Sequence, residues 1–263
     1  MIPNAKKVYN QIIEALTSDG RKGVVANIPS VTSAAFFRTV PFNPVPLDAP
    51  TSSALNAGLI GPLDQILTAL GQPDRLKPLA AVSNNPLLIV DEGLTNLGPQ
   101  IQTIAASSGN PQLVALAPFL GAVYGQARHA TKDDLVLLTT RTVIGQPAGS
   151  PVPSLNAFGV SFPLQDQHVL VPTEIEFINT ATTAFNNTIE SAAQSKGLAF
   201  VDINAIMREL STNGIRFDNY HTNQGIGTEF DDHLNDDDSS YEDSINHMDV
   251  SPIRILQPLT QPR

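Results

Sequence analysis

The sequence has 263 residues, of which 41% are hydrophobic and 15% charged, so it is long enough to bury a sizeable core in one globular unit. Acidic residues number 25 and basic residues 15, and the basic ones are scattered, which argues against nucleic acid as a partner. The absence of cysteine excludes disulfides, thiolate catalysis and cysteine-ligated metal sites together.

The N-terminal residues lack the pattern of a targeting signal. Residues 1–16, MIPNAKKVYNQIIEAL, contain neither an uninterrupted apolar stretch nor a small-residue cleavage site. No apolar run in the sequence approaches the roughly twenty residues that a membrane-spanning helix needs. We therefore expect a soluble chain with no transmembrane span and no signal peptide.

The first predicted elements are a helix and a strand. Apolar residues recur at helical spacing from Ala5 to Ser18, which indicates an amphipathic helix. The apolar run at residues 24–28 follows two glycines and ends at Pro29. This run suits a short strand that is buried on both faces.

The long segment at residues 32–170 is rich in proline, serine and small apolar residues. Helices are expected around residues 63–70 and 111–124, and short strands or helical turns at 87–90 and 135–138. Connections within compact α/β domains are usually much shorter. We therefore interpret this segment as an inserted, mostly helical or irregular subdomain.

A second helix and strand follow the inserted segment. Thr173-Glu174-Ile175-Glu176 comes after Pro172 and has the pattern of a capping box at a helix start. The helix should end at Lys196, with Gly197 in a left-handed cap, and residues 198–201 should form a second buried strand. This alternation of helix, glycine and apolar strand predicts an α/β fold.

The C-terminal segment, residues 219–263, is acidic and polar, and we expect a poorly ordered tail there. Asp236, Asp238 and Ser240 have the spacing of a calcium loop, but the turn glycine and the closing glutamate are missing. No built metal site is expected in this tail.

Six segments carry a resemblance to a known family: GVVANIPSVT (23–32), FFRTVPFNPVPL (36–47), IVDEGLTNL (89–97), RHATKDDLVLLTTRTVIGQ (128–146), GVSFPLQDQHVLVPTEIEFINTATTAFNNTIESAAQSKGLAFVDINAIMREL (159–210) and GIRFD (214–218). In this order they are similar to the SGNH/GDSL hydrolases found in Bacteroidota, often as exported lipoproteins. The resemblance runs through most of residues 5–218. It implies a hydrolase-like domain over residues 1–218, with part of a three-layer α/β/α fold around a parallel sheet.

The resemblance also implies an activity. Members of the family use a serine nucleophile to hydrolyse small ester or acylated substrates, without a cofactor, and hold the oxyanion with a backbone amide, a glycine and an asparagine. Their Gly-Asp-Ser and Gly-Asn-Asp blocks precede the strand matched by residues 24–28, and neither tripeptide occurs in this sequence.

We therefore expect a truncated, catalytically incompetent homologue, and the resemblance leaves open whether the chain is an enzyme. The missing N-terminal part of the fold is a candidate partner, and the family suggests an exported, periplasmic or outer-membrane location. The alternative is a noncatalytic module in which residues 32–170 bind carbohydrate or protein.

Two pairs are candidates for the acid and base of such a mechanism. Asp218 and His221 have the D-x-x-H spacing of many serine ester hydrolases, but the family register places them upstream of the catalytic block. Asp231 and His233 lie nearer the expected position, with a spacing that is wrong by a residue or two. The alternatives are a loop pair for the first and a solvated acidic tail for the second.

Other polar residues have more ordinary interpretations. His129 and His168 suit hydrogen-bonded structural or pocket-lining histidines better than metal ligands. Ser30, Ser33 and Ser161 lack the glycine context that exposes a nucleophile, so loop serines are expected.

Asn27 and Asp202 each follow a predicted strand, and open sheets bind ligands beyond the carboxyl ends of their strands. These two residues could line or support an active-site rim. Structural hydrogen bonding to loop amides is the alternative, because Asn and Asp commonly close turns.

Overall fold

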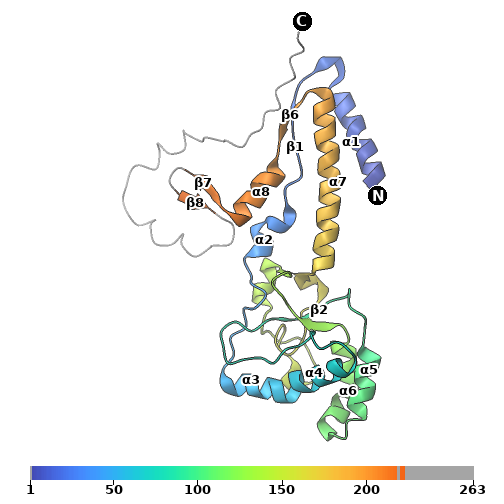
Figure 1. Cartoon of the computed structure of the whole chain (residues 1–263), viewed down its shortest axis with the longest axis vertical. Helices are drawn as coiled ribbons and strands as arrows, with labels where there is room; N and C mark the ends of the chain where they lie inside the picture. Colours follow the sequence, from blue (N-terminus) through green and yellow to red (C-terminus); the bar gives the residue numbers. More distant parts are fainter. Residues whose placement is uncertain (1, 218–219, 223–263) are drawn as a thin grey trace. The chain divides into compact units, whose positions relative to one another are not determined.

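The computed structural model describes residues 2–217 and 220–222 (Figure 1). The chain forms two compact units: a terminal unit, Met1–Ala35 with Ile175–Arg263, and a central unit, Phe36–Glu174. Helices and small sheets occur in both units, so the coarse prediction of a mixed α/β protein is confirmed. Whether the central unit is an insertion into a hydrolase-like domain, as predicted for residues 32–170, stays a prediction.

The terminal unit pairs strands from the two ends of the chain. β1 lies parallel to β6, with Val24 opposite Ala199 and Ala26 opposite Val201. A short antiparallel pair, β7 and β8, follows the last helix. The elements of this unit are α1 (Ile2–Leu16), β1 (Val24–Ala26), α7 (Pro172–Lys196, which begins in the central unit), β6 (Ala199–Val201), α8 (Ile203–Thr212), β7 (Ile215–Phe217) and β8 (Tyr220–Thr222).

The core of the terminal unit lies where α1, α7 and the β1–β6 pair meet. Its buried side chains are Ile13, Ile189, Ala192, Ala193, Leu198 and Phe200. Tyr9, Val25 and Ile28 pack against this cluster. The predicted helix near the N-terminus and both predicted strands are therefore present, with boundaries shifted by a few residues.

The predicted burial of β1 on both faces is wrong. Val24 is 68% exposed and Ala26 is also exposed, whereas Val25 between them is half-buried. Side chains of a strand alternate between its two faces. In the part of the chain that the structure describes, only the face that bears Val25 packs against the helix layer, so the face that bears Val24 is exposed to solvent.

The two ends of α7 can be compared with the predicted capping box and the predicted glycine cap. Glu174 Oε2 accepts a hydrogen bond from the backbone N–H of Val171 at 2.9 Å, so the capping contact lies two residues earlier than the predicted box. At the other end, Gly197 has φ of 60°, and the N–H of Leu198 donates to the carbonyl oxygen of Ala193 at 2.9 Å. This is the predicted left-handed glycine cap, in the form of a Schellman motif.

The central unit combines packed helices with two short antiparallel pairs, β2–β3 and β4–β5. The predicted helices around residues 63–70 and 111–124 correspond to α4 and α6. The elements are α2 (Ala35–Arg38, from the unit boundary), α3 (Ala49–Leu55), a π-helical turn (Asn56–Ile60), α4 (Gly61–Ala69), β2 (Leu88–Val90), α5 (Gly98–Ala106), α6 (Pro111–Tyr124), β3 (Ala127–His129), β4 (Leu135–Val136) and β5 (Val169–Leu170).

The largest hydrophobic core among the described residues lies between α4, α5 and α6. Leu63, Ile101, Leu120 and Tyr124 are among its fully or almost fully buried side chains. A Cβ atom added at Gly121 would lie 2.6 Å from the carbonyl oxygen of Gly98, so α5 and α6 approach each other backbone to backbone. Within the described ranges, no helix is both long and apolar enough to cross a membrane.

Candidate functional site

The carboxyl ends of β1 and β6 bring Asn27 and Asp202 together. Asn27 Nδ2 donates to Asp202 Oδ1 at 2.7 Å. The same carboxylate oxygen accepts the N–H of Ala205 at 2.9 Å, so Asp202 caps the N-terminus of α8. Asn27 Oδ1 accepts the N–H of Asn204 at 2.9 Å. We call Asn27, Asp202 and the asparagines bonded to this strand end, Asn186 and Asn204, the strand-end cluster.

Asn186, on α7, is hydrogen-bonded to the backbone of Ile28, which follows the carboxyl end of β1. Its side-chain oxygen accepts the N–H of Ile28 at 2.8 Å, and its side-chain nitrogen donates to the carbonyl oxygen of Ile28 at 2.9 Å. Asn204 Nδ2 donates to that carbonyl at 3.1 Å. Both backbone polar groups of Ile28, two residues beyond the end of β1, are therefore satisfied by one asparagine side chain.

The geometry of the strand-end cluster favours a structural role. Asn27 is only 9% exposed, and both of its side-chain polar atoms are engaged within the cluster. Asp202 uses one oxygen to accept two hydrogen bonds. The cluster fastens two strand ends to α7 and α8. Sequence reasoning missed Asn186 and Asn204, because their partners Ile28 and Asn27 lie 158 and 177 positions away in the sequence.

The three serines considered from the sequence are engaged within their own loops. Ser30 Oγ and Ser33 Oγ are buried and hydrogen-bonded to each other at 2.7 Å. Ser161 Oγ accepts the N–H of Ala157 at 3.1 Å. None of these contacts is to a basic group that would activate a nucleophile.

The predicted acid and base pairs stay predictions. Asp218, Asp231 and His233 lie outside the residues that the structure describes. Of His221, the structure describes the backbone, which pairs with Arg216 between β8 and β7.

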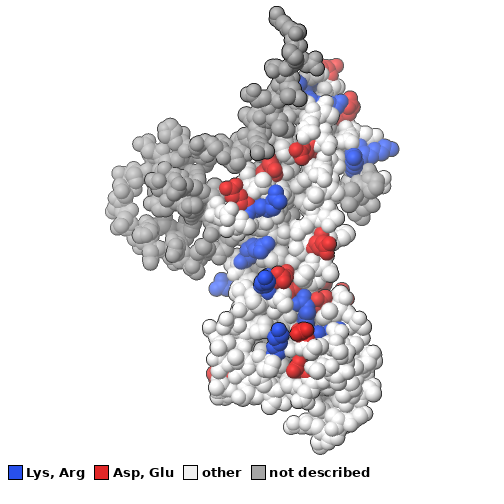
Figure 2. All heavy atoms as spheres, viewed as in Figure 1, with Lys and Arg blue, Asp and Glu red and all other residues white. Residues whose placement is uncertain are grey.

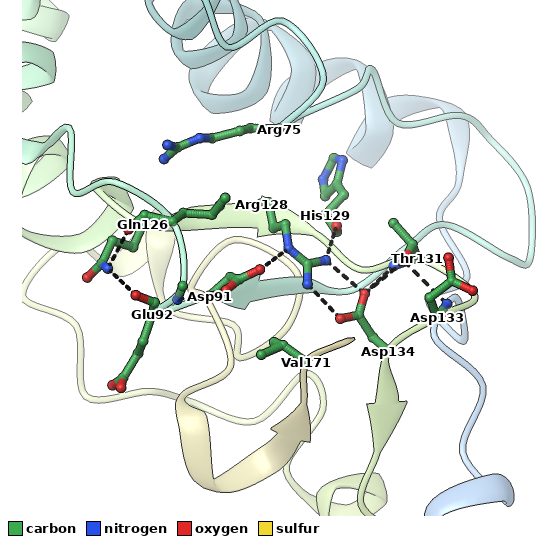
Figure 3. Close-up of polar contacts among 12 residues, drawn as sticks. Arg75, Asp91, Glu92, Gln126, Arg128, His129, Thr131, Asp133, Asp134 and Val171 are labelled. Atoms are coloured by element: carbon green, nitrogen blue, oxygen red, sulfur yellow. Dashed lines mark hydrogen bonds and ion pairs between the residues drawn. The ribbon is translucent and has the colours of Figure 1, made fainter. Parts of the chain in front are cut away.

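A buried ion-pair network lies beside the β2–β3 pair in the central unit (Figure 3). Arg128, on β3, donates from Nε to Asp91 Oδ2 at 2.7 Å. It also holds Asp134 in a two-pronged contact, with Nη1 to Oδ2 at 2.7 Å and Nη2 to Oδ1 at 2.6 Å. The Asp134 side chain is fully buried, and Thr131 donates to it from both its backbone N–H and its hydroxyl.

This network binds segments of the central unit to one another. Burial alone would lower the pKa of Arg128, but hydrogen bonds and charges from Asp134 and Asp91 outweigh it and raise the pKa overall. The guanidinium therefore stays charged and holds both carboxylates, which suits a structural role. Arg128 and Asp134 are the first and last residues of the segment RHATKDD (128–134). Nothing in the sequence of this segment indicated that their side chains would form an ion pair.

His129 and His168 are structural histidines in this fold. His129 Nδ1 accepts the backbone N–H of Lys77 at 3.1 Å, and His168 Nδ1 accepts that of Gln165 at 3.1 Å. Burial lowers the pKa of both rings, for His129 to about 4 with a further contribution from the charge of Lys77. His129 Nε2 is buried and has no hydrogen-bond partner among the described residues. No group of acidic or histidine side chains in the described residues could hold a metal ion.

The central unit also contains a half-open cavity of about 210 Å³. It lies among the end of β2, the end of α6, the turns that precede α5 and β3, and the loop before β5. Its lining carries no charged side chain and consists of Val90, Asn96, Ala122, Val123, Gly125, Gln126, Phe162 and Gln165. A shallower and wider groove, of about 500 Å³, lies beside the N-terminus of α3.

No protein-family model matches this sequence, and no curated protein or solved structure matches the chain. The fold therefore defines only a broad class, that of a mixed α/β protein with two compact units.

Proposed function

We propose that this chain is a homologue of the SGNH/GDSL ester hydrolases that binds ligands or partners and does not itself hydrolyse esters. The observation that supports it best is the parallel pairing of β1 with β6, with α7 leading into β6. A parallel pair joined through a helix is the unit from which three-layer α/β/α folds are built. The family resemblance implies sheet strands at both of these segments, residues 24–28 and 198–201.

The lack of activity is inferred from the groups that ester hydrolysis needs. These are a nucleophile, a base that takes its proton, and donors aimed at the oxyanion. Polar groups at the strand ends bond to one another, and Ser30 bonds to Ser33. The sequence contains neither a Gly-Asp-Ser nor a Gly-Asn-Asp tripeptide that would supply the family's nucleophile and oxyanion donors.

The proposal includes a partner that completes the sheet. Val24 on β1 is largely exposed, and so are Val8, Ile12 and Leu16, which follow one another at four-residue spacing on α1. The β1–β6 sheet has only two strands among the described residues, and exposed apolar side chains and unpaired strand edges favour association with further polypeptide. A polypeptide that carries the family's Gly-Asp-Ser and Gly-Asn-Asp blocks, neither of which occurs in this sequence, would be such a partner.

An esterase assay tests the proposal. Purified protein is incubated with p-nitrophenyl acetate and p-nitrophenyl butyrate, with and without a serine-directed inhibitor, beside an authentic serine esterase as a positive control. The expected rate equals that of buffer. Hydrolysis that the inhibitor abolishes would show that the chain carries its own nucleophile and would overturn the proposal.

A further inference from the structure

The lining segments of the 210 Å³ cavity in the central unit are hydrogen-bonded to one another and to the residues around them. The N–H of Asp91 donates to the carbonyl oxygen of Gln126, and the N–H of Leu97 donates to that of Gly125, both at 2.9 Å. Arg75 Nη1 donates to the same Gly125 carbonyl at 3.0 Å. Because the walls are already ordered, a ligand would lose little binding energy to rearrangement of the protein.

Three primary amides line this cavity, and each keeps one side-chain polar atom that no described residue bonds. Gln126 Nε2 donates to the carbonyl oxygens of Glu92 and Leu94, which leaves its Oε1 as an acceptor. Gln165 Nε2 donates to the carbonyl oxygen of Pro163, which leaves a second acceptor. Asn96 Oδ1 accepts the N–H of Gly98, so its amide nitrogen remains as a donor. Within the described part of the chain, these three remaining atoms have no protein partner.

Apolar side chains supply the rest of the lining, chiefly Val90, Val123 and the half-buried Phe162. Since no lining residue is charged, an ionised ligand would lose hydration without gaining an ion pair. The unit as a whole is poor in charge, with six Lys or Arg and nine Asp or Glu, and Figure 2 shows largely uncharged surface over it. The cavity therefore suits a neutral ligand.

Its volume limits the size of that ligand. Pockets for drug-sized molecules measure roughly 300–1,000 Å³, so a cavity of about 210 Å³ accommodates a single small ring. A hydroxyl group both donates and accepts hydrogen bonds, so a ring with several hydroxyls can satisfy one amide donor and two amide acceptors. Its C–H face can pack on Phe162.

We propose that this cavity binds one neutral monosaccharide unit through Asn96, Gln126 and Gln165. This inference rests on one part of the proposed function, namely that the chain binds a ligand and does not hydrolyse it. Its test differs from the esterase assay, so each proposal can fail without the other.

The test is an NMR titration of the full chain with glucose, galactose and N-acetylglucosamine up to tens of millimolar. We expect saturable shifts of the side-chain amide signals of Asn96, Gln126 and Gln165. Glucuronate, which adds a carboxylate, should bind more weakly than glucose. Absence of shifts with every neutral sugar, or shifts confined to residues outside the cavity, would overturn the proposal.

Variants show whether the shifts arise from this site. Asn96→Asp keeps the oxygen that accepts from Gly98 but removes the amide donor, and Gln165→Leu removes an acceptor on an exposed side chain. Each should weaken binding by up to about tenfold, the value of one hydrogen bond. Gln112→Leu, on the exposed surface of α6, is the matched control and should bind as the unaltered chain does. Equal affinity in all three variants would contradict the assignment, and Gln165→Leu keeps the test valid if Asn96→Asp folds poorly.

Discussion

Asn27 and Asp202, which are 175 positions apart in the sequence, are joined by a 2.7 Å hydrogen bond at the carboxyl ends of two parallel strands. Asp202 also caps α8, so one carboxylate holds a strand end and a helix start together. The bond links the two chain segments that make up the terminal unit.

Replacement of Asp202 by alanine should destabilise the terminal unit. The variant loses the cap of α8, typically worth about 1 kcal/mol, and leaves the amide of Asn27 without its acceptor, which costs a further 1–3 kcal/mol or so. Urea unfolding followed by circular dichroism measures the loss. Glu176→Ala, on the exposed side of α7, is the control and should change the free energy of unfolding by less than about 0.5 kcal/mol. Equal stability of the two variants would contradict a structural role for the cluster.

Arg128→Met should destabilise the central unit strongly. It retains an apolar side chain of similar length but leaves Asp91 and the fully buried Asp134 without their cation. Removal of one partner from a buried ion pair typically costs about 3–5 kcal/mol. The measurement is the shift in urea midpoint, with the exposed Arg141→Met as a matched control. A shift as small as that of the control would mean that the ion pairs of Arg128 contribute little to the stability of the folded state.

The stability of the central unit should fall on acidification. Burial lowers the pKa of His129 from 6.5 to about 4, so within this range the unfolded chain binds more protons than the folded chain. The stability contributed by the neutral ring is complete above pH 6.5 and is lost as the pH falls towards 4. Burial also lowers the pKa of His168, which acts in the same direction.

The variant His129→Asn isolates this contribution. The asparagine oxygen can accept the N–H of Lys77 as Nδ1 does, but it does not titrate. Melting temperatures of both proteins are measured across the same pH range. The variant should show a flatter dependence, whatever its absolute stability, and parallel curves would exclude His129 as a source of acid sensitivity.

Gly125→Ala should disturb the cavity wall. A Cβ atom at this position would lie 2.2 Å from Asn96 Oδ1 and 2.8 Å from the backbone nitrogen of Gly98. Forced overpacking of this kind typically costs about 1–3 kcal/mol. Gly58→Ala is the control, because an added Cβ there has no described atom within 4 Å apart from its chain neighbours and the backbone of its own helical turn. Thermal melting should separate the two variants, and similar melting temperatures would show that the turn can move.

The sequence predicted those elements whose signals are local. α6 spans Pro111–Tyr124, as predicted, because Asn110 caps it and Pro111 suits its first position. The end of α7 at Lys196, followed by the left-handed Gly197, follows from the same kind of signal. α5 was not predicted, since its packing depends on the close approach of Gly98 to Gly121, a contact with a distant segment.

Long-range polar contacts account for most of what was missed in the candidate site. Arg128 is hydrogen-bonded to Asp91, 37 positions away in the sequence, and Asn186 to Ile28, 158 positions away. No spacing rule connects such residues. The burial of β1 was predicted wrongly because an apolar run shows that a strand prefers burial, but not how many layers the fold provides to cover it.

The parallel pairing of β1 with β6 has a consequence for the order in which the chain folds. The central unit is continuous, so during synthesis it can complete its own contacts before β6 leaves the ribosome. β1 must remain unpaired over that whole interval, because its partner is 173 positions or more downstream and the loop between them has to close first. A released chain that ends just before Ala199 should therefore carry a protease-resistant central unit and a cleavable N-terminal segment.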